Sequence, residues 1–124
     1  MPEITDYESA DTYLRAGRNH ADRPAPTGAA TRIQRRGSAI AVNYRGTDVV
    51  TFARDGSIAI DRGDMLTRTT ADRIDTYSPM RVADGYQESG WTGKLVRHGS
   101  YAWTLTHPRG RREVLQDGGW FTPV

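Results

Sequence analysis

The 124-residue chain contains no cysteine and only one lysine. The lack of cysteine excludes disulfides, zinc fingers, iron–sulfur ligation and thiol nucleophiles, and it suits a reducing compartment. No apolar run approaches the roughly 18 residues of a membrane span, and the acidic start of the chain is unlike a signal peptide. We therefore expect a cytoplasmic protein with no membrane partner.

Apolar residues are also scarce: they make up 36% of the chain, and the mean hydropathy is -0.69. Six Tyr, three Trp and two Phe compensate in part, because aromatic side chains bury large areas. The length fits one core. We predict a single domain over residues 1–124, with a helix and an extended connector in residues 1–30 and a β-rich core in residues 31–124.

Charge is distributed unevenly along the sequence. Residues 1–22 carry two arginines and five acids, residues 23–36 carry four arginines and no acid, and residues 91–124 carry five basic and two acidic groups. The acids near the start could meet a basic partner or favour the N-terminal end of their own helix. The arginines suit bidentate contacts with carboxylate and phosphate.

Helical spacing of apolar residues predicts a helix in residues 6–17, with Gly17 as its C-terminal cap, and then an extended connector over 18–30. From Thr31 the period becomes two, and Gly37-Ser38 suits a tight hairpin. Four strands are predicted, at residues 31–36, 39–45, 47–54 and 57–61.

A second helix is predicted at residues 69–79, capped by Thr69 or Thr70 and ended by Pro79. Two hairpins are predicted after it, one joining 91–97 to 101–107 and one joining 112–116 to 120–124. This order predicts an α+β fold with a mainly antiparallel, curled sheet or a small barrel or sandwich, one N-terminal helix and one short internal helix.

The stretch "TFARDGSIAIDRGD" holds Asp55, Asp61 and Asp64. A calcium loop would need alternating oxygen ligands and a bidentate Glu, and this spacing does not supply them. Asp55-Gly56 is instead typical of a type I′ turn, and Asp61 to Asp64 also has turn composition. We predict no metal and no cofactor; a magnesium site at Asp61 or Asp64 would support the alternative of a metal-dependent hydrolase.

No serine-hydrolase, zinc-protease, P-loop or dinucleotide motif occurs in the sequence. His20, His98 and His107 are interpreted as solvated or turn-capping residues, because no partner can be assigned to them before their geometry is known. We therefore predict no catalytic residue and no enzymatic activity.

Two groups of arginines flank predicted turns and could form one surface if those turns point the same way. They are Arg32, Arg35, Arg36, Arg109, Arg111 and Arg112. Tyr101 and Trp103 could then stack on nucleic-acid bases. Alternation also places both aromatics on the face of Leu105, which favours the core. The open alternatives are a protein-binding surface and a nucleic-acid-binding module.

Several stretches together resemble small uncharacterised proteins of bacteriophages and mobile elements of GC-rich bacteria. They are "YLRAGRNHADRP", "TRIQRRGSAIAV", "TDVVTFARDGSIAIDRGD" and "LTRTTADRI". The chain departs from that pattern at Gly63-Asp64-Met65, where the family pattern has Gly-Gly-Trp. The resemblance implies a stoichiometric binder of a host protein or ribonucleoprotein complex, such as an inhibitor of a CRISPR-type defence complex.

Overall fold

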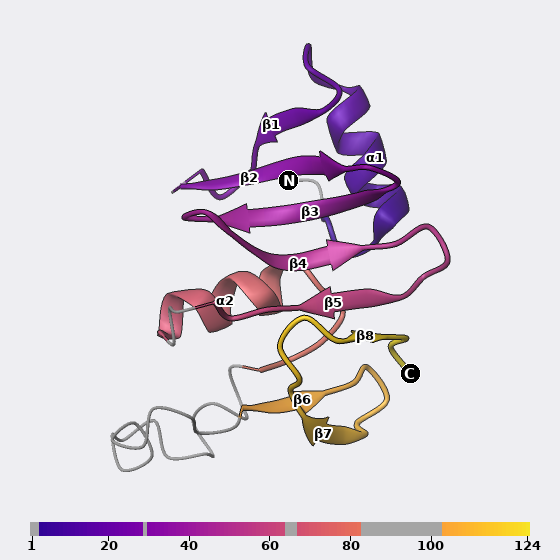
Figure 1. Ribbon diagram of the computed structural model, residues 1–124, viewed down its shortest axis with the longest axis vertical. Helices are drawn as coiled ribbons and strands as arrows, with labels where there is room; N and C mark the ends of the chain where they lie inside the picture. Colours follow the sequence, from indigo (N-terminus) through magenta and orange to yellow (C-terminus); the bar gives the residue numbers. More distant parts are fainter. Residues whose placement is uncertain (1–2, 29, 64–66, 83–102) are drawn as a thin grey trace.

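The computed structural model describes residues 3–28, 30–63, 67–82 and 103–124, in which two helices pack against an antiparallel sheet (Figure 1). In chain order the elements are α1 (Tyr7–Arg15), β1 (Asp22–Pro24), β2 (Thr31–Arg36), β3 (Ala39–Tyr44), β4 (Thr47–Phe52), β5 (Ile58–Ile60), α2 (Arg68–Thr76), β6 (Thr104–Thr106), β7 (Arg112–Val114) and β8 (Trp120–Phe121). This confirms the predicted α+β class and the two helices.

The main sheet has the strand order β1-β2-β3-β4-β5-β8, and β6 and β7 form a separate pair. All pairings are antiparallel. The main sheet is open, with β1 and β8 at its edges, so it does not close into the small barrel that was one of the predicted alternatives. Among the described residues, neither helix has the length and hydrophobicity of a membrane-spanning segment.

Both helices cover the same face of the main sheet. Thr31, Ile33 and Arg35 alternate along β2 and therefore share that face. Arg35 contacts Asp11 of α1, and Thr31 accepts a hydrogen bond from Arg73 of α2. Between the helices and the sheet lies one apolar cluster, which includes Leu14, Ile33, Ile40, Val42, Phe52, Ile60, Ile74 and Met80.

Helix α1 begins with a reciprocal capping box. The Asp6 carboxylate accepts the Ser9 backbone N–H at 2.8 Å, and the Ser9 hydroxyl accepts the Asp6 N–H. The C-cap residue of this helix is Ala16, whose backbone is right-handed, and Gly17 has no positive φ, so the predicted glycine cap is wrong. Helix α2 is capped by Thr67, two residues before the first residue predicted for that role.

Each turn between β2 and β5 contains a glycine with a positive φ. Gly37 (φ +61) closes the predicted two-residue connection of β2 to β3, and Arg45-Gly46, with φ +50 and +90, forms the type I′ turn from β3 to β4. The type I′ prediction for Asp55-Gly56 is wrong, because only Gly56 has a positive φ (+94). The Gly56 N–H donates a hydrogen bond to the Ala53 carbonyl, as in a three-residue loop.

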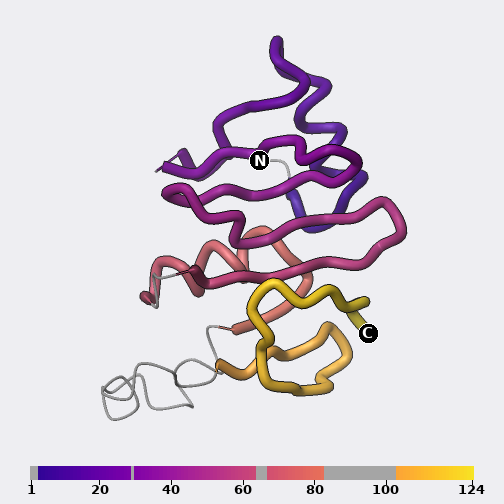
Figure 2. Tube along the Cα trace, in the orientation of Figure 1, coloured from indigo at the N-terminus to yellow at the C-terminus, as the bar shows by residue number. Residues whose placement is uncertain are grey.

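Two connections differ from the sequence prediction. The predicted connector contains β1, which pairs with β2. Strand β7 pairs with β6, and β8 pairs with β5, so the predicted hairpin of 112–116 with 120–124 is wrong. Figure 2 shows the C-terminal segment running beside β5. Asp117 binds the Arg62 guanidinium, and the Gly118 N–H donates to Ile60, which together bring β8 to β5.

Candidate basic pocket

The three arginines predicted as a group on β2 lie on two different faces of the sheet. Arg35 shares the helix-covered face with buried Ile33, whereas Arg32 and Arg36 point from the opposite, open face. Alternation along a strand separates neighbours in sequence, so the structure does not bring Arg32, Arg35 and Arg36 together.

On the open face both arginines are compensated by carboxylates. Arg32 Nε donates to Asp22 at 2.7 Å. Arg36 makes two hydrogen bonds to Asp48, at 2.9 and 3.0 Å, and Asn43 donates to the same carboxylate. Two guanidinium groups thus meet two carboxylates, and this surface has little net charge to offer a partner.

Arg35 belongs to a pocket on the side of the molecule where α1, the β2–β3 turn and the β4–β5 turn meet, at the right of Figure 1. Arg35 Nη2 donates to Asp11 at 2.5 Å, and Arg35 Nε donates to the His20 carbonyl at 2.8 Å. The pocket has a volume of about 460 Å³ and is lined by Tyr7, Arg15, His20, Arg35, Gly37 and Arg54.

Three guanidinium groups line this basic pocket, and in the part of the chain that the structure describes one carboxylate, that of Asp11, forms ion pairs with two of them. Asp11 accepts from Arg15 at 3.0 Å as well as from Arg35. Exposed Arg54 donates to the Tyr7 hydroxyl at 3.0 Å, and its guanidinium lies 5.5 Å from the centroid of that ring. The pocket therefore has an excess of positive charge.

The pKa values of the paired groups reflect this arrangement. The hydrogen bond from Arg35 lowers the pKa of Asp11 from its usual value of 3.8; burial opposes this, and Arg15 adds to it. The same hydrogen bond with Asp11 raises the pKa of Arg35. Both groups are held in their charged forms, because each ion stabilises the other.

Sequence reasoning missed Tyr7, Arg15, His20 and Arg54 as members of one site. The two ends of α1, the segment after it and the β4–β5 turn supply them, so only folding brings them together. Alternation alone could have separated Arg35 from its neighbours, since Ile33 and Arg35 share one strand face.

The second predicted arginine group lies on the β6–β7 pair, toward the end of the molecule opposite β2 (Figure 1). Arg111 is 3.5 Å from Glu113, and Arg109 and Arg112 are exposed. Strands β6 and β7 pair with each other outside the sheet that contains β2. The six predicted arginines therefore do not form one surface.

Of the two aromatic residues predicted to stack on bases, one is buried and the other lies outside the described residues. Trp103 is fully buried, and the Arg62 guanidinium lies 5.2 Å from its ring centroid. A base cannot stack on it without unfolding that region, so the proposed base-stacking role of Trp103 is unsupported. Tyr101 lies outside the described residues.

The aspartates shape the backbone. Asp55 accepts the Ser57 N–H at 2.9 Å, and Asp61 accepts the Gly63 N–H at 2.7 Å. Within the four described ranges, no group of three or more His, Asp or Glu side chains is placed to hold a metal ion. Asp64 and His98 lie outside those ranges.

Of the two described histidines, His20 is exposed at the basic pocket. His107 is buried, which differs from the solvated or turn-capping role predicted for it. Its Nδ1 accepts the Val124 N–H at 3.1 Å, so its Nε2 carries the proton and donates to Glu113 at 2.5 Å. Nδ1 therefore binds the last residue of the chain, and Nε2 binds strand β7.

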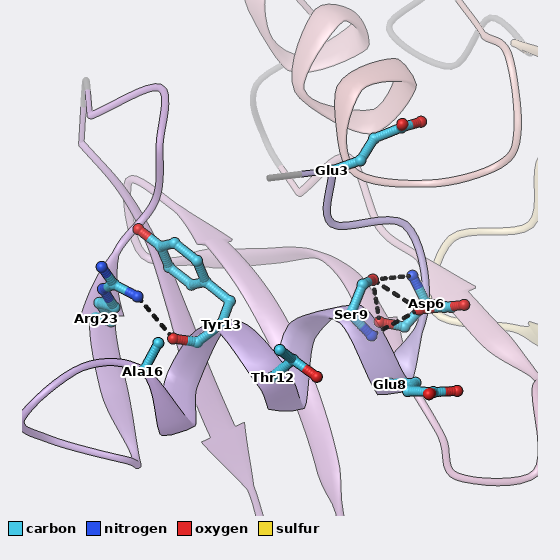
Figure 3. Close-up of a pocket in the computed structure, with 8 residues that line it drawn as sticks. All are labelled: Glu3, Asp6, Glu8, Ser9, Thr12, Tyr13, Ala16 and Arg23. Carbon is cyan, nitrogen blue, oxygen red and sulfur yellow. Dashed lines mark hydrogen bonds between the residues drawn. The ribbon is translucent and has the colours of Figure 1, made fainter. Parts of the chain in front are cut away.

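A second hollow, of about 570 Å³, runs along α1 (Figure 3). Its acidic lining includes Glu3, Asp6 and Glu8, and Figure 3 shows the Asp6 carboxylate beside Ser9 in the capping box. At the other end, Arg23 donates to the Tyr13 carbonyl at 2.7 Å. These contacts explain Asp6 as part of the helix cap and Arg23 as an anchor of the helix.

No protein-family model, curated protein or solved structure matches the chain. The chemistry of the described residues therefore carries the functional proposal. Among the surfaces described above, the basic pocket combines a concave shape with uncompensated charge.

Acid should weaken the fold through two paired carboxylates. The pKa of Asp11 is lowered as described above; burial raises that of Asp48, but hydrogen bonds from Arg36 and Asn43 outweigh burial and keep it below 3.8. A carboxylate whose pKa is lower in the folded state than in the unfolded state stabilises the fold fully at pH values above its unfolded-state pKa. This stabilisation is lost as the pH falls through its folded-state pKa.

At pH values below about 4, we expect the free energy of unfolding to decrease. The decrease should be less steep in the double variant Asp11→Asn, Asp48→Asn. Urea unfolding followed by circular dichroism between neutral and acidic pH measures both slopes. Equal slopes in the two proteins would contradict this assignment.

Proposed function

We propose that the protein is a non-enzymatic binding protein that recognises its partner through the basic pocket. The single observation that carries the proposal is that Arg15, Arg35 and Arg54 line one hollow, whereas among the described residues one carboxylate, that of Asp11, pairs with two of them. Clusters of arginine are a recurring means of recognising phosphorylated or acidic segments of proteins.

The pocket is also pre-organised for binding. Arg35 is fixed by Asp11 and the His20 carbonyl, and Arg54 is held against the ring and hydroxyl of Tyr7. Side chains already ordered lose little conformational entropy when a ligand arrives, and hydrogen bonds from guanidinium to an anion are among the stronger ones.

The resemblance to small phage and mobile-element proteins supports a partner inside the cytoplasm of a bacterial host. We propose a host protein or ribonucleoprotein complex as that partner, and stoichiometric inhibition of a defence complex as the consequence of binding. Steering by the positive pocket would speed encounter with an acidic partner surface.

Co-purification from a bacterial lysate with affinity-tagged protein tests this proposal. Arg54→Glu reverses an exposed charge of the pocket, whereas Arg109→Glu, a matched control, reverses an exposed charge on the β6–β7 turn. We expect a partner retained in equimolar amount by the parent protein and by Arg109→Glu, and lost from Arg54→Glu. Equal retention by all three proteins would contradict the proposal.

Nuclease treatment of the lysate separates the nucleic-acid alternative. The positive pocket also attracts nucleic acid, but the buried position of Trp103 and the paired charges of Arg32 and Arg36 favour a protein partner. Retention that survives nuclease supports a protein target. Retention lost with nuclease, together with a steep salt dependence, would replace it with nucleic acid.

A further inference from the structure

The three guanidinium groups of the basic pocket come from three different elements. Arg15 ends α1, Arg35 lies near the end of β2, and Arg54 follows β4 in the turn toward β5. They therefore approach the pocket from separate parts of the backbone, and the Tyr7 hydroxyl lies beside Arg54.

We infer that the basic pocket takes a phosphate group carried as a monoester on the partner protein. This inference rests on the proposed binding function and names the group that is recognised. A carboxylate is planar and is satisfied by one guanidinium in a bidentate pair. A phosphate offers oxygens in tetrahedral directions and can accept from several guanidinium groups at once.

Charge favours the same ligand. Three guanidinium groups and Asp11 leave an excess of two positive charges among the contacts described for the pocket. A phosphomonoester carries about −1.5 to −2 at neutral pH and so nearly neutralises that excess. A single carboxylate would leave about half of it.

The residues around the basic pocket favour an isolated phosphate group over the backbone of a nucleic acid. A strand of nucleic acid presents a row of phosphates and needs a track of free cations beside the first one. The nearest arginines of β2 on the open face, Arg32 and Arg36, are instead paired with Asp22 and Asp48. The volume of about 460 Å³ leaves room for the side chain that carries the phosphate.

Titration of the isotope-labelled protein with inorganic phosphate, followed by two-dimensional NMR, tests this inference. We expect saturable shifts of the Arg35 and Arg54 Nε–H signals and of the Gly37 amide, absent with succinate at equal ionic strength. Arg54→Gln should weaken phosphate binding at least about tenfold, as loss of one charged hydrogen bond predicts. Arg109→Gln should bind like the parent protein.

A phosphoserine peptide, its unphosphorylated parent and a short single-stranded oligonucleotide distinguish the sources of the phosphate. We expect binding of the phosphorylated peptide alone. The inference is overturned if phosphate causes no saturable shift, if succinate binds equally well, if Arg54→Gln keeps the parent affinity, or if the oligonucleotide binds more tightly than the phosphopeptide.

The two proposals can fail separately. A partner lost from Arg54→Glu in co-purification, combined with indifference to phosphate, would leave the binding function and overturn the phosphate assignment. Phosphate binding at the pocket, combined with unchanged partners in Arg54→Glu, would leave the phosphate site and overturn the proposed function.

Discussion

Trp103→Ala should lower the free energy of unfolding by about 3–5 kcal/mol, the range for removing a large aromatic side chain from a core. Trp103 is 0% exposed and belongs to the apolar cluster between the elements. Removal leaves a cavity as well as losing buried area. Urea unfolding followed by circular dichroism measures the loss, since the change in tryptophan content would alter fluorescence.

Trp120→Ala is the matched control for this experiment. Trp120 lies on the edge strand β8 and is 53% exposed, so its removal should cost less than about 1 kcal/mol. Trp103→Phe should fall between the parent protein and Trp103→Ala. An equal loss at Trp103 and Trp120 would contradict the assignment of Trp103 to the core and reopen its base-stacking role.

Arg35→Ala should cost about 2 kcal/mol, because hydrogen bonds to charged groups stabilise more than neutral ones and Arg35 joins α1 to the sheet. Its side chain is 26% exposed and that of Asp11 is 21% exposed, so solvent screens this pair less than a surface pair. The loss includes the Asp11 carboxylate left without its closest cation.

A double-mutant cycle isolates the interaction between Arg35 and Asp11. We expect a coupling energy of about 1–2 kcal/mol for this pair, against less than about 1 kcal/mol for the more exposed pair Arg32 and Asp22. Chemical denaturation of the parent, single and double variants gives both values. A coupling near zero for Arg35 and Asp11 would remove this ion pair as the contact that fixes α1 and the pocket.

Local patterns predicted much of the fold. Alternation located β2 to β5 because each strand has one face buried against the helices, and the apolar spacing of α1 reflects Ala10 and Leu14 in the core. Such signals are local, and the chain follows them where local preference and tertiary packing agree.

The pairing of β8 with β5 could not be predicted from local signals. Asp117-Gly118-Gly119 has the composition of a hairpin turn, which favoured pairing with the preceding strand. The contacts that decide the pairing, from Arg62 to Asp117 and from Gly118 to Ile60, join residues more than fifty positions apart. Distant contacts of this kind override turn propensity.

The candidate site could be predicted from the sequence only in part, for the same reason. Arg35 was predicted as a partner-binding residue, but it was grouped with Arg32 and Arg36 because they are close in sequence. The other side chains that line the basic pocket come from α1, from the segment after it and from the β4–β5 turn; they are Tyr7, Arg15, His20 and Arg54. Which carboxylate neutralises which arginine also depends on folding, as the pairing of Arg36 with Asp48 illustrates.

Arg54 lies in an excess of positive charge, whereas the charge of Arg36 is compensated by Asp48. The most direct test is the salt dependence of stability in Arg54→Gln and Arg36→Gln, compared with the parent protein between about 0.02 and 0.5 M sodium chloride. Salt screens repulsion and attraction alike, so the two variants should respond in opposite directions.

As salt rises, the parent protein should gain stability relative to Arg54→Gln and lose stability relative to Arg36→Gln. Urea unfolding at each salt concentration gives both differences. If the two variants instead follow the same trend, the charge of Arg54 is compensated like that of Arg36, and the basic pocket has no surplus with which to hold an anion.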